Sequence, residues 1–129
     1  MPERYYTVAE ANGVLPEVRR VVGQMLLARQ EVLDMQPDLW PAVAKAVNNG
    51  GGRTLTAAAR QIMLIQQILQ VLNDMGIQVK DLNIGLIDFP ARHLGRTVLL
   101  CWQYDEPSVQ FWHEIDAGFA GRQRIIDWD

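Results

Sequence analysis

The side chains with the clearest capacity for chemistry are three neighbours near the C-terminus, His113, Glu114 and Asp116. Imidazole and carboxylate groups bind Zn²⁺, Mn²⁺ or Fe²⁺, so their clustering indicates a divalent metal site. A β-strand is predicted over residues 109–114, and consecutive side chains on a strand point to opposite faces. His113 and Glu114 therefore cannot share one ion while the strand stays regular. His113 and Asp116 can converge only because we expect the strand to end near Ile115.

Asp88 is the second candidate ligand, an acid inside an apolar strand predicted over residues 84–89. Burying such a charge costs several kcal/mol unless it is paired or hydrogen-bonded. If Asp88 lies opposite Leu100 and His113 opposite Val98, the two side chains share a face. They are then about 10 Å apart, which is too far for one ion. A one-residue slip in the first hairpin moves Asp88 to the other face.

The interpretation that we favour for these residues is structural. His113 then forms a hydrogen bond within the sheet, and Asp88 holds the nearby turn or pairs with an arginine, since single histidines and short acidic clusters are mostly structural.

Four arginines near the predicted sheet form a third cluster, for which the chemistry is binding of a small anion: Arg92, Arg96, Arg122 and Arg124. Backbone amides of residues 118–122 together with a guanidinium group can bind a phosphate or a carboxylate. Neither a Walker lysine nor a glycine-rich dinucleotide motif accompanies them. The alternative, which we favour, is that Arg122 pairs with Asp116 or Asp88 and holds the C-terminal segment in place.

Cys101 is the only cysteine, which excludes an internal disulfide and a multi-cysteine metal site. Its position in the middle of an apolar strand predicts a buried and unreactive thiol, because reactivity needs exposure and a lowered pKa. Ser108, the only serine, follows a proline in a predicted turn, and no Ser-His-Asp arrangement is evident. We therefore expect the protein not to be an enzyme.

The chain has 129 residues, of which 49% are hydrophobic, and a net charge of −3, which together indicate one globular domain. No apolar run approaches the roughly 18 residues of a membrane span. The acidic balance opposes general nucleic-acid binding, which requires a strongly basic surface. The absence of an apolar signal region at the N-terminus and the single cysteine predict a cytoplasmic location.

Two helical regions are predicted in the first half of the chain. Thr7 and Glu10 form a capping box that begins a short helix, which we expect to end at Gly13. Pro16 is tolerated in the first turn of a second helix, whose apolar positions recur at three- and four-residue spacing as far as Gln36.

A flexible connection is predicted over residues 37–53, because three consecutive glycines are costly to order, although residues 41–47 within it could form two turns of helix. The next long helix begins at Thr54 or Thr56 and ends at Gly76. Its apolar stripe is wider than one packing face requires. We expect the long helices to form an antiparallel hairpin whose surplus apolar surface packs on the sheet or on another copy of the chain.

Three strands are predicted in the second half, over residues 84–89, 97–103 and 109–114, followed by a loop over residues 115–129. The middle strand is apolar on both faces, as in a strand that is covered on both sides. The predicted fold is α+β, an N-terminal antiparallel helical hairpin followed by a small three-stranded antiparallel sheet. One face of the sheet takes the helices, and the other meets a second subunit or the C-terminal segment.

Several segments resemble DUF2203, a family of uncharacterised bacterial proteins: Thr7–Arg19 (TVAEANGVLPEVR), Val79–Arg92 (VKDLNIGLIDFPAR), Leu100–Trp102 and Phe111–Gln123 (FWHEIDAGFAGRQ). The last segment is the most specific of them. The resemblance implies a shared fold and no established activity. Relatives tend to have glycine where Asp105 stands and proline where Arg124 stands, and the second difference affects the shape of the C-terminal loop.

Two functional hypotheses follow. We favour a non-enzymatic protein that associates with itself as a homo-oligomer, because of the wide apolar stripes and the two-sided central strand. The alternative is a protein that binds a divalent metal or a small anion, either as a binding protein alone or as a hydrolase. Its site, at the sheet edge and C-terminal loop, would contain His113, Asp116, Glu114, Asp88 and the arginines. The sequence identifies no small-molecule ligand.

Overall fold

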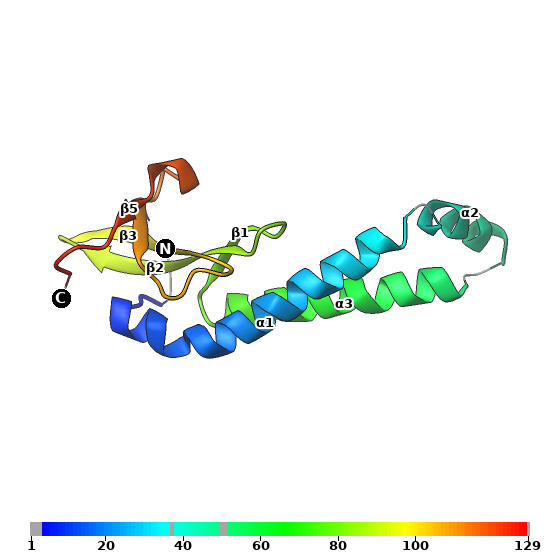
Figure 1. Cartoon of the computed structure of the whole chain (residues 1–129), viewed down its shortest axis with the longest axis horizontal. Helices are drawn as coiled ribbons and strands as arrows, with labels where there is room; N and C mark the ends of the chain where they lie inside the picture. The colour runs from blue at the N-terminus through cyan, green and yellow to red at the C-terminus, as the bar shows by residue number, and fades with distance from the viewer. Residues whose placement is uncertain (1–3, 37, 50–51, 129) are drawn as a thin grey trace.

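The computed structural model describes residues 4–36, 38–49 and 52–128 of the chain. Three helices come first and five short strands follow, so the predicted α+β class is confirmed. The sheet contains five strands rather than the three predicted, because two short edge strands carry too few residues to give an alternating pattern. Figure 1 shows the sheet at one end of an elongated molecule, with the helices forming an arm that extends away from it.

Helix α1 spans Val8–Asp34 without interruption, so the predicted break near Gly13 and restart at Pro16 is wrong. The capping box is confirmed, since the Thr7 hydroxyl accepts from the Glu10 amide at 3.0 Å and the Glu10 carboxylate accepts from the Thr7 amide at 2.9 Å. Buried side chains continue on one side of the helix through the proline: Ala11, Leu15, Val18 and Val22. This continuous burial outweighs the one backbone hydrogen bond that proline removes.

Helix α2 spans Leu39–Asn49 and lies at the far tip of the arm (Figure 1), within the segment predicted to be a flexible connection. Gly50 and Gly51, which motivated that prediction, lie outside the described residues. Helix α3 spans Arg53–Asp74 and has Gly52 as its N-cap, without a side-chain hydrogen bond, so the predicted threonine caps are not used. It ends two residues before Gly76, the predicted stop, where φ is 78°. Helices α1 and α3 pack against each other in opposite directions (Figure 1).

The sheet is an antiparallel meander in which each strand pairs with the next in the chain. Its strands are β1 (Gln78–Asp81), β2 (Leu86–His93), β3 (Arg96–Gln103), β4 (Phe111–Glu114) and β5 (Gln123–Arg124). Leu94 and Gly95, with φ values of 50° and 78°, form the two-residue turn between β2 and β3. Two consecutive residues of positive φ suit the right-handed twist of the flanking strands.

Both faces of the central strands are buried, as predicted from the apolar run in β3. One face joins Phe89, Leu100 and Trp102 to the buried side of α1 in a single hydrophobic core. The C-terminal segment packs on this core through Ile125 and Trp128. The opposite face carries the buried acid, thiol and imidazole described below.

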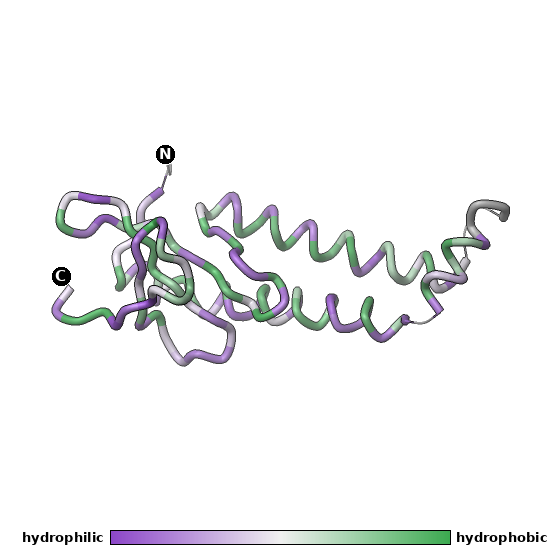
Figure 2. Tube along the Cα trace, turned by 90° about the horizontal axis from the view of Figure 1, so that it is seen from above, coloured by the Kyte–Doolittle hydropathy of each residue, from purple (hydrophilic) through white to green (hydrophobic). Residues whose placement is uncertain are grey.

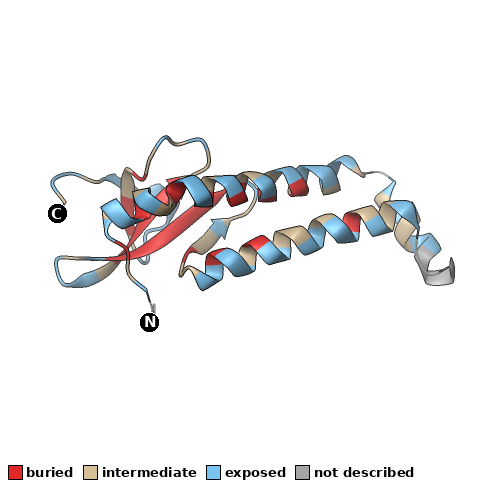
Figure 3. Cartoon of the chain, turned by 90° about the horizontal axis from the view of Figure 1, so that it is seen from below, coloured by how far each residue is buried: buried red, intermediate tan, exposed pale blue. Residues whose placement is uncertain are grey.

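Residues of the arm are much less buried than residues of the sheet. Figure 3 shows buried positions concentrated in the sheet and in the part of α1 beside it, while much of the arm is exposed or half-buried. The last buried residue of α1 is Ala28, six residues before the helix ends at Asp34. None of the helices in the described ranges is both long and apolar enough to cross a membrane.

Candidate functional site

Three strands place one chemically active side chain each on the same face of the sheet. Asp88 of β2 pairs with Cys101 of β3. His113 of β4 pairs with Leu99, two residues before Cys101 on β3. Because side chains alternate along a strand, Asp88, Cys101 and His113 all point to the face opposite the helices. Their ligand atoms lie within 4.8 Å of one another.

The predicted register was displaced by one residue in both strand pairs, since Asp88 was expected opposite Leu100 and His113 opposite Val98. Both partners on β3 move by one residue in the same direction along the strand. Asp88 and His113 therefore still lie opposite residues two apart on β3, as predicted. Their predicted separation of about 10 Å, derived from strand spacing, is wrong. His113 Nε2 lies 3.0 Å from Asp88 Oδ2, because the side chains extend toward each other across β3.

The cluster is closed to solvent. Asp88 and Cys101 are 0% exposed and His113 is 3% exposed. Burial raises the pKa of the Asp88 carboxyl above its ordinary value, and the nearby His113 opposes that shift. Burial also raises the pKa of the Cys101 thiol to about 12, with the charge of Asp88 adding to the effect. Cys101 without a bound cation is therefore a thiol at neutral pH, which agrees with the unreactive cysteine predicted from the sequence.

The hydrogen bonds of His113 define which of its nitrogens carries a proton. Nδ1 lies 2.7 Å from the backbone carbonyl oxygen of Glu114. A carbonyl oxygen only accepts, so Nδ1 is protonated and donates. The other nitrogen, Nε2, then faces Asp88 Oδ2 and shares a single proton with it. The second carboxylate oxygen, Asp88 Oδ1, is buried and has no hydrogen-bond partner among the described residues.

The other two predicted metal ligands are not part of this cluster. Glu114 lies on the opposite face of the sheet from His113, as strand alternation predicts. Its carboxylate forms a two-pronged ion pair with Arg96, at 2.9 and 2.6 Å, and this pair lowers the pKa of Glu114. Asp116 is exposed in the turn that follows β4. The structure therefore brings together Asp88 and His113 but leaves Glu114 and Asp116 outside.

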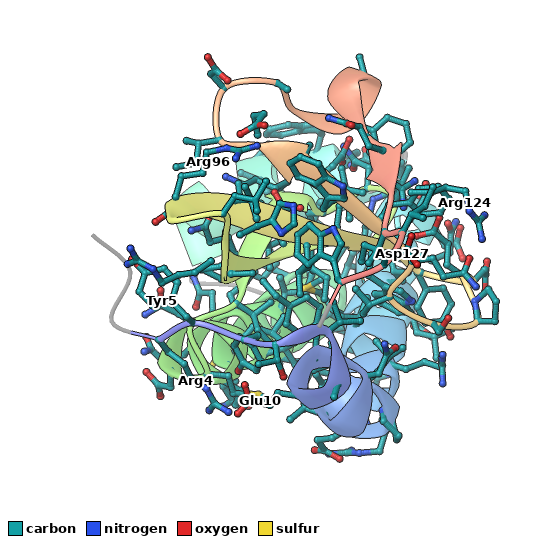
Figure 4. The ribbon with its side chains drawn as sticks, turned by 90° about the vertical axis from the view of Figure 1, so that its left-hand side faces the viewer. Arg4, Tyr5, Glu10, Arg96, Arg124 and Asp127 are labelled. Carbon is teal, nitrogen blue, oxygen red and sulfur yellow. The ribbon has the colours of Figure 1, made fainter. Side chains whose placement is uncertain are left out.

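The four arginines of the predicted anion site do not converge. Figure 4 shows Arg96 and Arg124 at different sides of the molecule. Arg96 is paired with Glu114, and Arg92 lies over the Tyr5 ring, with 5.3 Å from its guanidinium carbon to the ring centroid. Residues predicted to bind one anion are thus divided between the β2–β3 turn, beside Arg92 and Arg96, and the edge strand β5, beside Arg122 and Arg124.

Arg122 pairs with Glu106, not with Asp116 or Asp88 as predicted. Its Nη2 donates to both oxygens of the Glu106 carboxylate, at 2.7 and 2.8 Å. The guanidinium carbon lies 4.0 Å from the centroid of the Phe111 ring. Arg122 therefore holds the C-terminal segment in place, as expected, but through a different acid.

Sequence reasoning missed two residues of this region as functional candidates. Cys101 was set aside because its neighbours in β3 are apolar, and only the correct register shows that it faces Asp88. Glu106 lies in the turn after β3, where acidic residues are common and carry no specific signal. Its backbone carbonyl accepts from the Trp102 indole at 2.9 Å, and its carboxylate accepts from the Gln103 amide at 2.7 Å.

These features define an α+β protein with a helical arm and a small meander sheet that buries an acid, a thiol and an imidazole together. The chain belongs to the family described as uncharacterized conserved protein (DUF2203), whose family model matches residues 4–125. No curated protein and no solved structure matches it.

Proposed function

We propose that the protein is a non-enzymatic, self-associating protein whose helical arm packs against the arm of a second copy. The observation that carries this proposal is the composition of α3. From Gln61 to Asn73 the helix contains 13 consecutive residues without a charged side chain, although many of them are exposed. A helix that faces water on one side ordinarily carries charged residues there, and the centres of protein interfaces are depleted of them.

Exposed apolar side chains occur along the same helix. Met63 is 58% exposed, Val71 is 45% exposed and Ile62 is 44% exposed. Figure 2 shows apolar residues recurring along both long helices of the arm, well beyond the sheet. Each apolar side chain that a second copy covers contributes about 25 cal/mol for every Å² removed from water. A second arm would therefore supply the burial that the sheet supplies at the other end of α1.

The dimensions of the arm suit a dimer. The 22 residues of α3 correspond to a length of about 33 Å, and two adjacent helices are about 20 Å wide. The face of the arm therefore offers about 700 Å², close to the roughly 800 Å² that each partner buries in a stable interface. Two arms packed face to face form a four-helix arrangement, a common way to bury wide apolar stripes.

The charged side chains near the sheet support a structural use over a catalytic one. Arg96 and Arg122, two of the four arginines considered for anion binding, are engaged with Glu114 and Glu106 of the same chain. A guanidinium that is already paired with a carboxylate of its own chain must lose that pair before it can bind a substrate anion in the same way. This arrangement favours the self-associating protein over the anion-binding hydrolase.

The test is the molar mass of the full chain in solution, measured by sedimentation equilibrium across the micromolar range. We expect the wild type to have the mass of two 14.6 kDa chains. Met63→Glu places a charge on the arm and should shift the protein to monomer. Ile126→Glu is the matched control, because Ile126 is 69% exposed but lies in the C-terminal segment, and it should remain dimeric.

A wild type that stays monomeric throughout this range would overturn the proposal. Equal dissociation by Met63→Glu and Ile126→Glu would also overturn it, since the contact would then not lie on the arm. Circular dichroism of each variant verifies that the helices are retained.

A further inference from the structure

We propose that Asp88, Cys101 and His113 form a binding site for a transition-metal ion of the zinc type. This inference is independent of self-association through the arm. The three side chains come from β2, β3 and β4 and meet on the sheet face opposite the helices. Neither Glu114 nor Asp116, the acids nearest to His113 in the sequence, belongs to the site.

The spacing of the ligand atoms is close to that of a zinc centre. Tetrahedral Zn²⁺ with ligands at about 2.0–2.3 Å holds those ligand atoms about 3.3–3.7 Å from one another. Here Nε2 of His113 lies 3.0 Å from Oδ2 of Asp88, and the Cys101 sulfur completes a set within 4.8 Å. Small side-chain rotations would bring all three atoms onto one ion.

The orientation of His113 matches that of a metal ligand. A metal-bound histidine almost always donates its other ring N–H to a carboxylate, a carbonyl or water, which fixes the tautomer. His113 does this through Nδ1 and the carbonyl oxygen of Glu114. The lone pair of Nε2 is consequently directed into the cluster, toward Asp88 and Cys101.

The second carboxylate oxygen of Asp88 points to a missing partner. Oδ1 is buried, and no described donor lies within hydrogen-bond geometry of it, although the Cys101 thiol lies close enough to the carboxyl to lower the pKa of Asp88 through a weak hydrogen bond. Leaving a buried acceptor unsatisfied is costly, so such atoms are few in folded proteins. A cation bound between Asp88 and Cys101 would satisfy this oxygen.

The exchange of protons for the metal leaves the buried charge unchanged. Without metal, the cluster holds the Cys101 thiol proton and the one proton shared by Asp88 and His113, and its net charge is zero. Zn²⁺ displaces both protons, and the thiolate and carboxylate then balance its two positive charges. The ion therefore enters without the large penalty of burying a net charge.

The donor set selects the class of metal. A thiolate and an imidazole favour Zn²⁺, and Co²⁺ as its spectroscopic substitute, over Mg²⁺ and Ca²⁺, which prefer oxygen ligands. Glu106 does not supply a fourth ligand, because Arg122 and the Gln103 amide occupy its carboxylate. Among the described residues no other histidine, cysteine or acid joins the set, so the fourth position is left to a neutral water molecule.

The experiment is a Co²⁺ titration of the full chain after removal of metals with a chelator, followed by ultraviolet absorption. Thiolate-to-cobalt charge transfer gives a band that can arise only from Cys101, because the chain has one cysteine. We expect the band to saturate at one ion per chain and to disappear on addition of Zn²⁺. Calorimetry in two buffers should report two protons released per ion.

Variants locate the site. Cys101→Ser should abolish the band, and Asp88→Asn should weaken Co²⁺ binding by at least about tenfold, since loss of even an outer-shell partner of a ligand costs about 10–100-fold. Asp116→Asn is the matched control, an exposed acid near His113 whose loss should change nothing. A folded wild type without the band would overturn the proposal, and so would a band that depends on Asp116. If Cys101→Ser does not fold, the wild-type titration alone still decides.

Discussion

His113 Nε2 and Asp88 Oδ2 lie 3.0 Å apart in a part of the sheet that excludes solvent. In the metal-free protein the two residues hold one proton between them, because two facing acceptors at this distance would repel each other. The pair is neutral overall whether that proton resides on the acid or on the imidazole. The orientation of His113 is fixed independently by the bond from Nδ1 to the Glu114 carbonyl oxygen.

The first prediction concerns this pair. Asp88→Asn retains a donor to Nε2 and the shape of the side chain, whereas Asp88→Ala leaves Nε2 unpaired beside a cavity. We expect Asp88→Ala to have a free energy of unfolding lower than that of Asp88→Asn by about 1–3 kcal/mol. Urea unfolding in the presence of a chelator measures the difference. Equal stability of the two variants would show that the hydrogen bond contributes little.

The second prediction concerns the reactivity of Cys101. Its pKa in the folded chain is about 12, against 9.0 for an ordinary thiol, and the thiolate is the form that reacts with iodoacetamide. Between pH 8 and pH 10, labelling of the unfolded chain should accelerate as the thiol ionises, while labelling of the folded, metal-free chain stays slow. Mass spectrometry of samples quenched with and without urea measures both rates.

The sign of this pKa shift also predicts a loss of stability at alkaline pH. The folded chain holds the Cys101 proton more tightly than the unfolded chain, so the contribution is complete below pH 9.0 and is lost as the pH rises toward about 12. The variant Cys101→Ala should lack this dependence on pH, which denaturation at several alkaline pH values measures.

The labelling experiment has its own control. A double variant, Cys101→Ala with Ile126→Cys, places the thiol at an exposed position and should be labelled rapidly without urea. Slow labelling of that control would mean that burial is not the cause.

The sequence predicted the elements of the fold better than their boundaries. The long helices and the capping box follow from local patterns that persist in the structure. Helix α1 passes through Pro16 because burial on either side of the proline depends on the sheet, which local rules do not include. Strands β1 and β5 are stabilised by pairing with β2 and β4, and their own residues give no periodic signal.

The candidate site was predicted in part. The shared face of Asp88 and His113 follows from strand alternation, which a joint displacement of both registers does not change. Their close approach depends on side-chain length and direction, which strand spacing omits. Cys101 could be assigned to the site only from the true register, because nothing in an apolar strand distinguishes a thiol that faces an acid. Glu106 could be identified as the partner of Arg122 only from the path of the turn after β3.

The third prediction concerns the ion pair between Arg122 and Glu106, whose side chains are 12% and 22% exposed. Arg122→Met retains contact with the Phe111 ring but removes the charge. We expect Arg122→Met and Glu106→Gln each to lower the free energy of unfolding by about 1–3 kcal/mol. The double variant should show a coupling of about 1 kcal/mol or more, since the residues are in direct contact.

Arg20 and Glu17 provide the control for that cycle. They form a similar pair on α1, but both side chains are 56% exposed. Exposed pairs one helical turn apart contribute little to stability, because water and salt screen them. Coupling energies of the same size in the two cycles would contradict the view that burial makes the Arg122 pair the stronger one.

The fourth prediction compares two glycines whose surroundings differ. Gly85 has a φ of 65°, and a Cβ built there would lie 2.9 Å from Tyr104 Cβ and 3.0 Å from a methyl group of Val22. Alanine would therefore combine a strained backbone with steric overlap against the core. Gly13 lies within α1, and a Cβ there has no atom within 4 Å. Alanine at that position gains helix propensity without a clash.

Gly85→Ala should lower the free energy of unfolding by about 1–3 kcal/mol, the usual cost of overpacking a core. Gly13→Ala should raise it by up to about 1 kcal/mol. Chemical denaturation of both variants beside the wild type measures the two changes, and far-ultraviolet circular dichroism verifies that the helices remain. If Gly13→Ala were destabilising, the continuous path of α1 through Gly13 and Pro16 would be in question. If Gly85→Ala were neutral, the contact between the β1–β2 turn and Val22 would be looser than the structure indicates.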